Sequence, residues 1–199
     1  MSLDTGSERF RGCMSSFLTA YRTNSLPKED LVMRRRENID WFSSLRFKKV
    51  HDLREDQIAD ILSRCEVSYF IDRTGRYDDP AVSIIRDNPH VTVSSFLISM
   101  IRSGTISMAD YDLEIKGMDG SVKTELVSMI APCKFVPMDD FTLHTFEYLG
   151  MCDLSDMFMS YMRFGISCKR ILEELQKAGI LRADLSTVTE FLYHCFDQF

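Results

Sequence analysis

The chain has 199 residues, of which 24 are Lys or Arg and 30 are Asp or Glu, so its formal net charge is -6 at pH 7. Hydrophobic residues make up 45% of it and charged residues 27%, as in ordinary soluble globular domains. This composition excludes collagen-like, low-complexity and wholly disordered chains, and the net charge excludes a strongly basic nucleic-acid binder. The length predicts a single helical domain over residues 1–199; the polar residues 72–79 mark where the chain would divide into a basic N-terminal and an acidic C-terminal part.

The 6 cysteines are spread along the sequence and form no Cys-x-x-Cys pair. This spacing favours free, buried thiols over a zinc site or a disulfide framework, so we expect no metal and no cofactor. The charged N-terminus, Met1–Arg11, is unlike a signal peptide, and the longest apolar-leaning uncharged run, Asn88–Ile101, is shorter than the about 20 residues of a membrane helix. We expect a cytoplasmic or nuclear protein with no membrane span.

Apolar residues at helical spacing predict a series of helices in the first half of the chain. Asp52 and Glu55 have the spacing of a capping box, and Asp79-Pro80 is typical of a helix start. The segment after Pro89 carries no charge until Arg102, which places its helix at the centre of the core, and Gly104 is suited to end it. The predicted helices span residues 10–21, 25–45, 52–65, 80–87 and 93–103.

Two features distinguish the second half. Residues 112–126 alternate between apolar and charged side chains on either side of Gly117-Met118-Asp119-Gly120, a pattern that predicts a small β-hairpin. Beyond it, Gly150, Gly165 and Gly179 each follow a helical pattern, so they predict short helices with glycine stops. These helices span residues 141–149, 154–164, 168–178 and 188–196. The predicted fold class is mainly α, compact, with about seven to nine helices and the one hairpin over residues 112–126.

The sequence contains none of the usual catalytic or nucleotide-binding motifs. Asp140 and His144 would share a helix face, which we interpret as a surface ion pair. Cys133 precedes His144, and a thiol–imidazole couple needs the two to meet in space, which the sequence does not require. His194 and Cys195 are adjacent on a helix and point about 100° apart, so they are poorly placed to share one metal ion, and Cys195 fits the core.

The charge is unevenly distributed. Residues 1–54 hold 11 Lys and Arg against 7 Asp and Glu, a net +4, whereas the remaining 145 residues hold 13 against 23, a net -10. Residues 34–54, the basic stretch, interleave Trp41, Phe42 and Phe47 with basic side chains, a combination suited to phosphate contact and base stacking. The candidate partner- or phosphate-binding residues are Arg34, Arg35, Arg36, Arg46, Lys48, Lys49 and Arg54.

Four interpretations of the basic stretch remain open: a solvated face, a match to the chain's own acidic part, an acidic protein partner, and nucleic acid or phosphoinositide. Three successive arginines spread over about 200° of a helix, so they do not all face one ligand. The 12 methionines, several of them in Met157–Met162, suit either core filling or an adaptable binding groove. Phe17–Arg22, followed by Pro27 and Leu31, resembles a helix of the N-terminal module of Ras-type exchange factors, but the rest of the chain departs from that pattern and no function is carried over.

The leading functional hypothesis is a non-enzymatic protein-interaction or adaptor domain that uses a helical surface and binds a protein partner. It rests on the missing catalytic motifs, the two-signed charge distribution and the Met- and aromatic-rich helices. The first alternative is a nucleic-acid (RNA) or phosphate-binding protein that uses residues 34–54. The second alternative is an enzyme whose site is dispersed along the chain and is not readable from sequence.

Overall fold

The computed structural model describes residues 4–45, 52–65, 80–150 and 161–198. Within these ranges the chain is mainly helical, as predicted, and forms ten α-helices and one 3-10 helix. No helix in the same ranges has the length and apolar character needed to cross a membrane. The elements are α1 (Glu8–Arg22), η1 (Leu26–Lys28), α2 (Asp30–Ser44), α3 (Glu55–Leu62), α5 (Pro80–Asp87), α6 (His90–Ser103), α7 (Met108–Asp112), α8 (Gly120–Ile130), α9 (Asp140–Tyr148), α10 (Tyr161–Lys177) and α11 (Leu185–Phe196).

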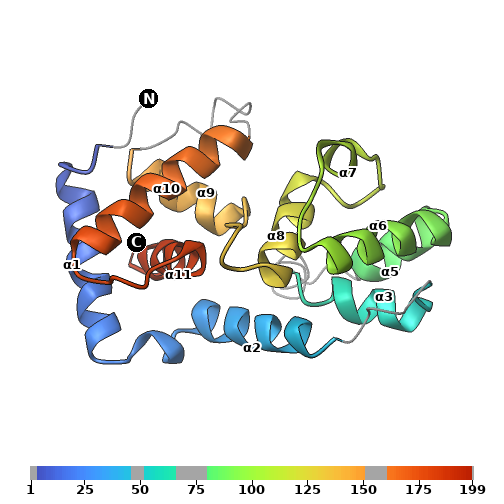
Figure 1. Ribbon diagram of the computed structural model, residues 1–199, viewed down its shortest axis with the longest axis horizontal. Coiled ribbons are helices and arrows are strands. Elements are labelled where there is room, and N and C mark those ends of the chain that lie inside the picture. Colours follow the sequence, from blue (N-terminus) through green and yellow to red (C-terminus); the bar gives the residue numbers. More distant parts are fainter. Residues whose placement is uncertain (1–3, 46–51, 66–79, 151–160, 199) are drawn as a thin grey trace.

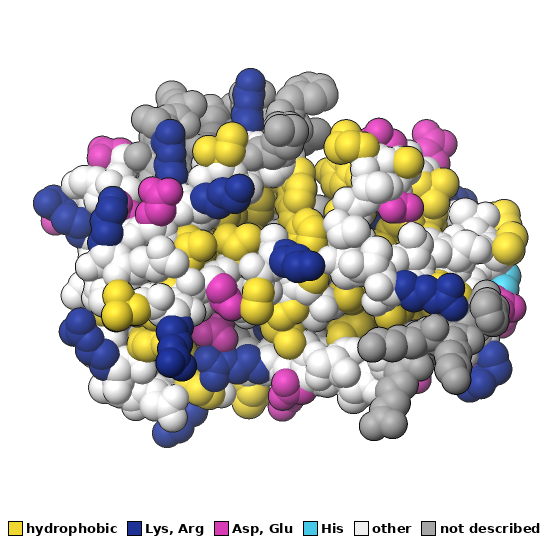
Figure 2. Space-filling view, viewed as in Figure 1, with side chains coloured by type: hydrophobic (Ala, Val, Ile, Leu, Met, Phe, Trp, Pro, Cys, Tyr) yellow, Lys and Arg dark blue, Asp and Glu magenta, His cyan; other side chains and the backbone are white. Residues whose placement is uncertain are grey.

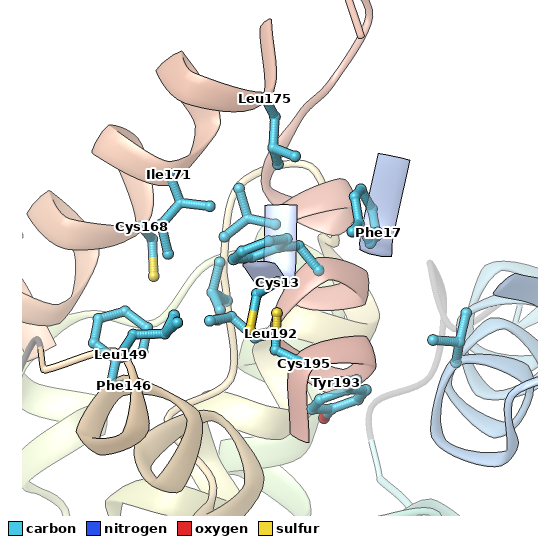
Figure 3. Packing of buried hydrophobic residues seen from close by; sticks show 14 of the residues in the cluster. Cys13, Phe17, Phe146, Leu149, Cys168, Ile171, Leu175, Leu192, Tyr193 and Cys195 are labelled. Carbon is cyan, nitrogen blue, oxygen red and sulfur yellow. The ribbon is translucent and has the colours of Figure 1, made fainter. Parts of the chain in front are cut away.

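The first of two hydrophobic clusters is built from the two ends of the chain. Helices α1, α9 and α10 surround α11 (Figure 1), and their apolar faces meet around it (Figure 3). The ring of Phe17 on α1 lies edge-on to Phe191 on α11 at 5.4 Å, and Phe146 on α9 stacks on Phe164 of α10 at 4.8 Å. All four phenylalanines are fully buried, so this cluster fixes how the N- and C-terminal helices sit against each other.

The second cluster is formed by α3, α5, α6 and α8 in the middle of the sequence. Ile58, Leu97 and Leu126 are fully buried in it. Helix α2 contributes to both clusters, since Leu31 belongs to the first and Phe42 to the second. Figure 1 shows α2 lying along one edge of the molecule beneath both groups of helices. The basic stretch therefore begins on the helix that joins the two clusters.

Helix ends largely follow the sequence signals. Ser7 accepts the backbone N–H of Phe10 at the start of α1, and Gly104 ends α6 in the left-handed conformation with φ 58°. The predicted Asp52–Glu55 capping box is wrong, because Asp52 instead accepts a hydrogen bond from Ser94 of α6. Helix α3 begins at Glu55. The predicted helix over 25–45 is also divided, at Glu29, into η1 and α2.

The predicted β-hairpin over residues 112–126 is wrong. The described residues in this region form no strand, only an isolated bridge between Ile115 and Met118, and α8 occupies the second half. Asp119 accepts the N–H of Val122 and so starts a helix where the pattern predicts a strand. Every residue from Val122 to Met129 is buried, polar ones included. The alternation therefore did not separate an inner from an outer face, because α8 is enclosed on all sides.

The predicted helix stop at Gly165 is also wrong. Helix α10 runs without interruption from Tyr161 to Lys177, so Gly165 lies inside it and no new helix begins at residue 168. Gly150 and Gly179 do lie beyond helix ends, with φ of 70° and 104°. Most of the helix predicted over 154–164, and most of the methionine-rich segment Met157–Met162, lies outside the described residues.

Candidate functional site

Some basic side chains of the basic stretch are already bonded to other groups of the same chain. Arg35 is only 3% exposed, and its guanidinium donates to the side chain and to the backbone carbonyl of Ser128 on α8, both at 3.2 Å. A guanidinium buried between two helices has no face to offer a phosphate or an acidic partner. Arg35 therefore fastens α2 to α8.

Arg36 makes a second internal contact. It forms a two-bonded ion pair with Glu190 of α11, with distances of 2.7 and 3.0 Å. The hydrogen bonds that Arg36 donates to Glu190 raise the pKa of the Arg36 guanidinium, so its charge is kept. For Arg35 and Arg36 the geometry agrees with the interpretation that the basic stretch matches polar and acidic groups of the same chain.

The other members of the basic stretch are placed differently. Arg34 is half-buried on α2, and Arg54 is exposed and forms a two-bonded pair with Asp56 in the first turn of α3. Arg46, Lys48 and Lys49 lie outside the described residues. Binding of phosphate or of a partner by the basic stretch stays a prediction. Arg35 is buried, and the Arg36 side chain, although 42% exposed, is already paired with Glu190.

The histidine and cysteine residues considered in the sequence do not come together in one site within the described residues. The Nδ1 atom of His144 lies 3.8 Å from Glu147 rather than pairing with Asp140. Nearby Asp184, together with burial, raises the pKa of the Cys133 thiol, which is the opposite of what a nucleophilic cysteine needs. In the described part of the chain no contact joins Cys133 to His144.

A more distinctive surface lies where α6, α7 and the following loop meet. Val91, in the first turn of α6, is 68% exposed, and Leu113, just after α7, is 36% exposed. Both line a shallow hollow of about 350 Å³ together with the edge of Phe96 and with Asp110. Phe96 itself is buried, so the hollow has an apolar floor and apolar rims.

Local hydrogen bonds hold this surface in place. Ser107 accepts the N–H of Asp110 at the start of α7, and the Asp110 carboxylate accepts the Ser107 N–H in return, a reciprocal cap. The Lys123 ammonium of α8 donates to the backbone carbonyls of Tyr111 and Leu113. Burial lowers the pKa of Lys123, but its bonds to two carbonyls fasten the segment after α7 to the central helix.

A second hollow, of about 560 Å³, lies on the other side of Leu113 and includes Asp112 and Glu114 in its lining. The lining of this second hollow also holds Asp119, Lys116 and Lys123, so Leu113 stands between an apolar depression and a charged one. We call the surface formed by the following residues of the two hollows the Leu113 surface: Val91, Phe96, Asp110, Asp112, Leu113 and Glu114.

The Leu113 surface has a negative charge. Asp112 and Glu114 are exposed and take part in none of the ion pairs formed among the described residues, and the neighbouring Lys116 is paired with Asp87 at 3.1 Å. Figure 2 shows hydrophobic side chains beside acidic ones over the part of the molecule that carries α7. The surface therefore combines exposed apolar groups with exposed carboxylates, and the charges of Asp110 and Asp112 act on the nearby Lys123 ammonium.

Sequence reasoning missed this surface for an identifiable reason. It assigned residues 112–126 to a hairpin and treated the uncharged helix after Pro89 as wholly internal, so neither Leu113 nor Val91 stood out. The available signal was the position of Val91, which lies two residues before Val93 and therefore off the face that Val93 and Leu97 bury. Leu113 between Asp112 and Glu114 was a second signal.

The comparisons with known proteins add no relative. No protein-family model, no curated protein and no solved structure matches the chain. The short resemblance of Phe17–Arg22 to Ras-type exchange factors accordingly gains no support. The functional argument rests on the residues and distances of this chain alone.

Proposed function

We propose that this protein is a protein-interaction domain and that its Leu113 surface binds a basic, amphipathic helical segment of a partner protein. The observation that carries the proposal is the pairing of exposed Val91 and Leu113 around one hollow with the exposed carboxylates of Asp112 and Glu114 beside it. This proposal keeps the interaction-domain hypothesis drawn from the sequence and gives it a location and a partner chemistry.

Apolar and charged groups would contribute to this binding in different ways. An amphipathic helix lays its apolar face into a groove and anchors through side chains one turn apart. Full burial of one Leu or Val side chain stabilises a complex by about 1.5–3 kcal/mol. The exposed carboxylates of Asp112 and Glu114 favour a Lys- or Arg-rich partner and speed its approach, an effect that salt screens.

The test is a binding titration with a matched pair of probes. A short, labelled amphipathic peptide of leucine and lysine is added to the protein, and fluorescence anisotropy is compared with that of the analogue in which every lysine is replaced by glutamate. We expect the basic peptide alone to bind, and its affinity to fall as salt is raised. Equal binding of the two peptides, or of neither, would contradict the proposal.

Variants locate the binding on the molecule. Leu113→Ser removes the apolar side chain between the two hollows and should weaken binding of the basic peptide about two- to fivefold, since Leu113 is 36% exposed and its remaining burial supplies about a third of the about 1.5–3 kcal/mol of a whole side chain. The matched control is Leu181→Ser, because Leu181 is 84% exposed and lies between α10 and α11, away from the Leu113 surface. If the control weakens binding as much as Leu113→Ser, the peptide binds elsewhere.

A further inference from the structure

Two polar side chains from the N-terminal part of the chain meet one near its C-terminus, among the helices of the first hydrophobic cluster. The Oγ atom of Ser16, on α1, lies 2.9 Å from Nε2 of His194, on α11. The Nδ1 atom of the same imidazole lies 2.8 Å from Oε1 of Glu29, the residue that precedes α2. A hydroxyl, an imidazole and a carboxylate joined in this order form the arrangement that activates a serine nucleophile.

The packing holds the imidazole in a fixed orientation. The His194 side chain is only 4% exposed, and its ring lies edge-on to Phe17 at 5.8 Å. Phe17 in turn packs against Phe191, one turn before His194 on α11. Two hydrogen bonds and a buried aromatic neighbour therefore fix the imidazole between α1 and the start of α2.

The direction of proton transfer follows from the partners of the two ring nitrogens. Glu29 accepts a hydrogen bond from Nδ1–H, which leaves Nε2 free to accept the proton of the Ser16 hydroxyl. The other carboxylate oxygen of Glu29, Oε2, is buried and has no hydrogen-bond partner within the described residues. The contact with His194 is therefore the main polar contact of the Glu29 carboxylate. The arrangement stabilises the imidazolium that forms when Ser16 loses its proton.

The surroundings of His194 are acidic. Burial and the charges of Glu29 and Asp30 raise the pKa of Asp197, and His194 lowers it, so Asp197 is a second carboxyl group near the imidazole. His194 also lies in the last turn of α11, where the helix dipole favours positive charge.

Ser16 is accessible from outside. It lines an open hollow of about 350 Å³ whose wall also includes Arg9, Tyr148 and Gln198. Gly12 lies one helical turn before Ser16, and a Cβ atom there would meet no atom within 4 Å, so the approach to the hydroxyl is open. Oε1 of Gln198 lies 3.4 Å from Oγ, a longer contact than the 2.9 Å between Oγ and Nε2 of His194.

We propose that Ser16 is a nucleophile for small acyl esters, with His194 as general base and Glu29 as the positioning residue. Ser16 Oγ attacks the ester carbonyl carbon while its proton moves to Nε2. The ester C–O bond then breaks, His194 returns the proton to the leaving alcohol, and the acyl group stays on Ser16. Water, deprotonated by His194, releases the acyl group as a carboxylic acid, so one ester and one water give one acid and one alcohol.

The direct test uses a fluorophosphonate probe, which bonds covalently to activated serines, with the modified residue identified by peptide mass spectrometry. We expect the adduct on Ser16, formed about 100-fold or more faster than any adduct on the Ser16→Ala variant. Ser15→Ala is the matched control, since Ser15 is the exposed neighbour on α1 and should not affect the rate. An unmodified wild-type protein, or equal labelling of Ser16→Ala, would overturn the proposal.

Two further variants separate chemistry from folding. Glu29→Gln keeps the shape of the side chain but removes its charge, so labelling should slow about 100-fold while the melting temperature changes little, and the proton resonance of the His194 Nδ1–H should move upfield. Gly12→Leu fills the approach without touching the three residues, so labelling should be lost while that resonance stays. Wild-type labelling of Glu29→Gln would remove Glu29 from the mechanism, and wild-type labelling of Gly12→Leu would show that the hollow is not the route.

Discussion

Asp139 is a buried carboxyl group that serves two elements at once. One oxygen accepts the N–H of Thr142 at 2.8 Å at the start of α9, and the other accepts the hydroxyl of Tyr193 on α11 at 2.7 Å. Burial raises the pKa of Asp139 above its ordinary 3.8, against the opposing effects of these hydrogen bonds and of Arg35. The cap and the link between α9 and α11 therefore depend on a group whose charged form the interior disfavours.

This residue gives the stability a pH dependence of known sign. A carboxyl group whose pKa is raised by folding holds a proton at a pH where the unfolded chain has lost it, so its contribution to stability falls as the pH rises above 3.8. Asp139→Asn removes the titration and keeps an oxygen for Thr142. Urea unfolding between about pH 4 and pH 7 should show the variant gaining stability relative to the wild type as the pH rises. A difference that stays constant with pH would contradict this assignment.

Helix α10 shows how an element can override a local signal. Gly165 lies within its interior, and a Cβ atom there would meet no atom within 4 Å. The helix continues through this glycine because Phe164, Cys168, Ile171 and Leu175 recur at helical spacing and are all fully buried. Packing of that stripe outweighs the preference of one glycine for a helix end.

Gly165→Ala should therefore stabilise the protein. Alanine restricts the unfolded chain and suits a helix interior, so the free energy of unfolding should rise by about 0.5–1 kcal/mol. Gly104→Ala is the matched control of opposite sign, because Gly104 has φ of 58° and alanine is strained there by about 1–2 kcal/mol. Chemical denaturation of the two variants beside the wild type measures both changes. A loss of stability in Gly165→Ala would mean that α10 is broken at this residue.

Some elements of this fold are predictable from the sequence and others are not. Stops at Gly104 and Gly179 and the stripe of α1 follow from backbone conformation and spacing within one turn or two, and these were predicted. The hairpin failed because the surroundings of Val122–Met129 are set by helices elsewhere in the chain. Ser16 and Glu29 reach His194 across separations of 178 and 165 residues, and no local pattern records such a meeting.

At the scale of the whole molecule, α2 couples the two hydrophobic clusters. It buries Leu31 in the first cluster and Phe42 in the second, and between them Arg35 bonds to Ser128 of α8 while Arg36 pairs with Glu190 of α11. Loss of either cluster would leave a buried guanidinium or carboxylate without its partner, which is strongly unfavourable. The arrangement favours unfolding of both clusters as one unit.

The single tryptophan makes this coupling measurable. Trp41 packs against the second cluster and lies under the Arg64 guanidinium at 4.0 Å, so its fluorescence reports on that cluster, whereas circular dichroism at the helical band reports on all helices. Because α2 ties the clusters together, we expect the urea transitions followed by the two methods to coincide within error. If Trp41 changed at lower urea than the helical signal, the second cluster would unfold by itself, and the contacts of Arg35 and Arg36 would be too weak to join the two.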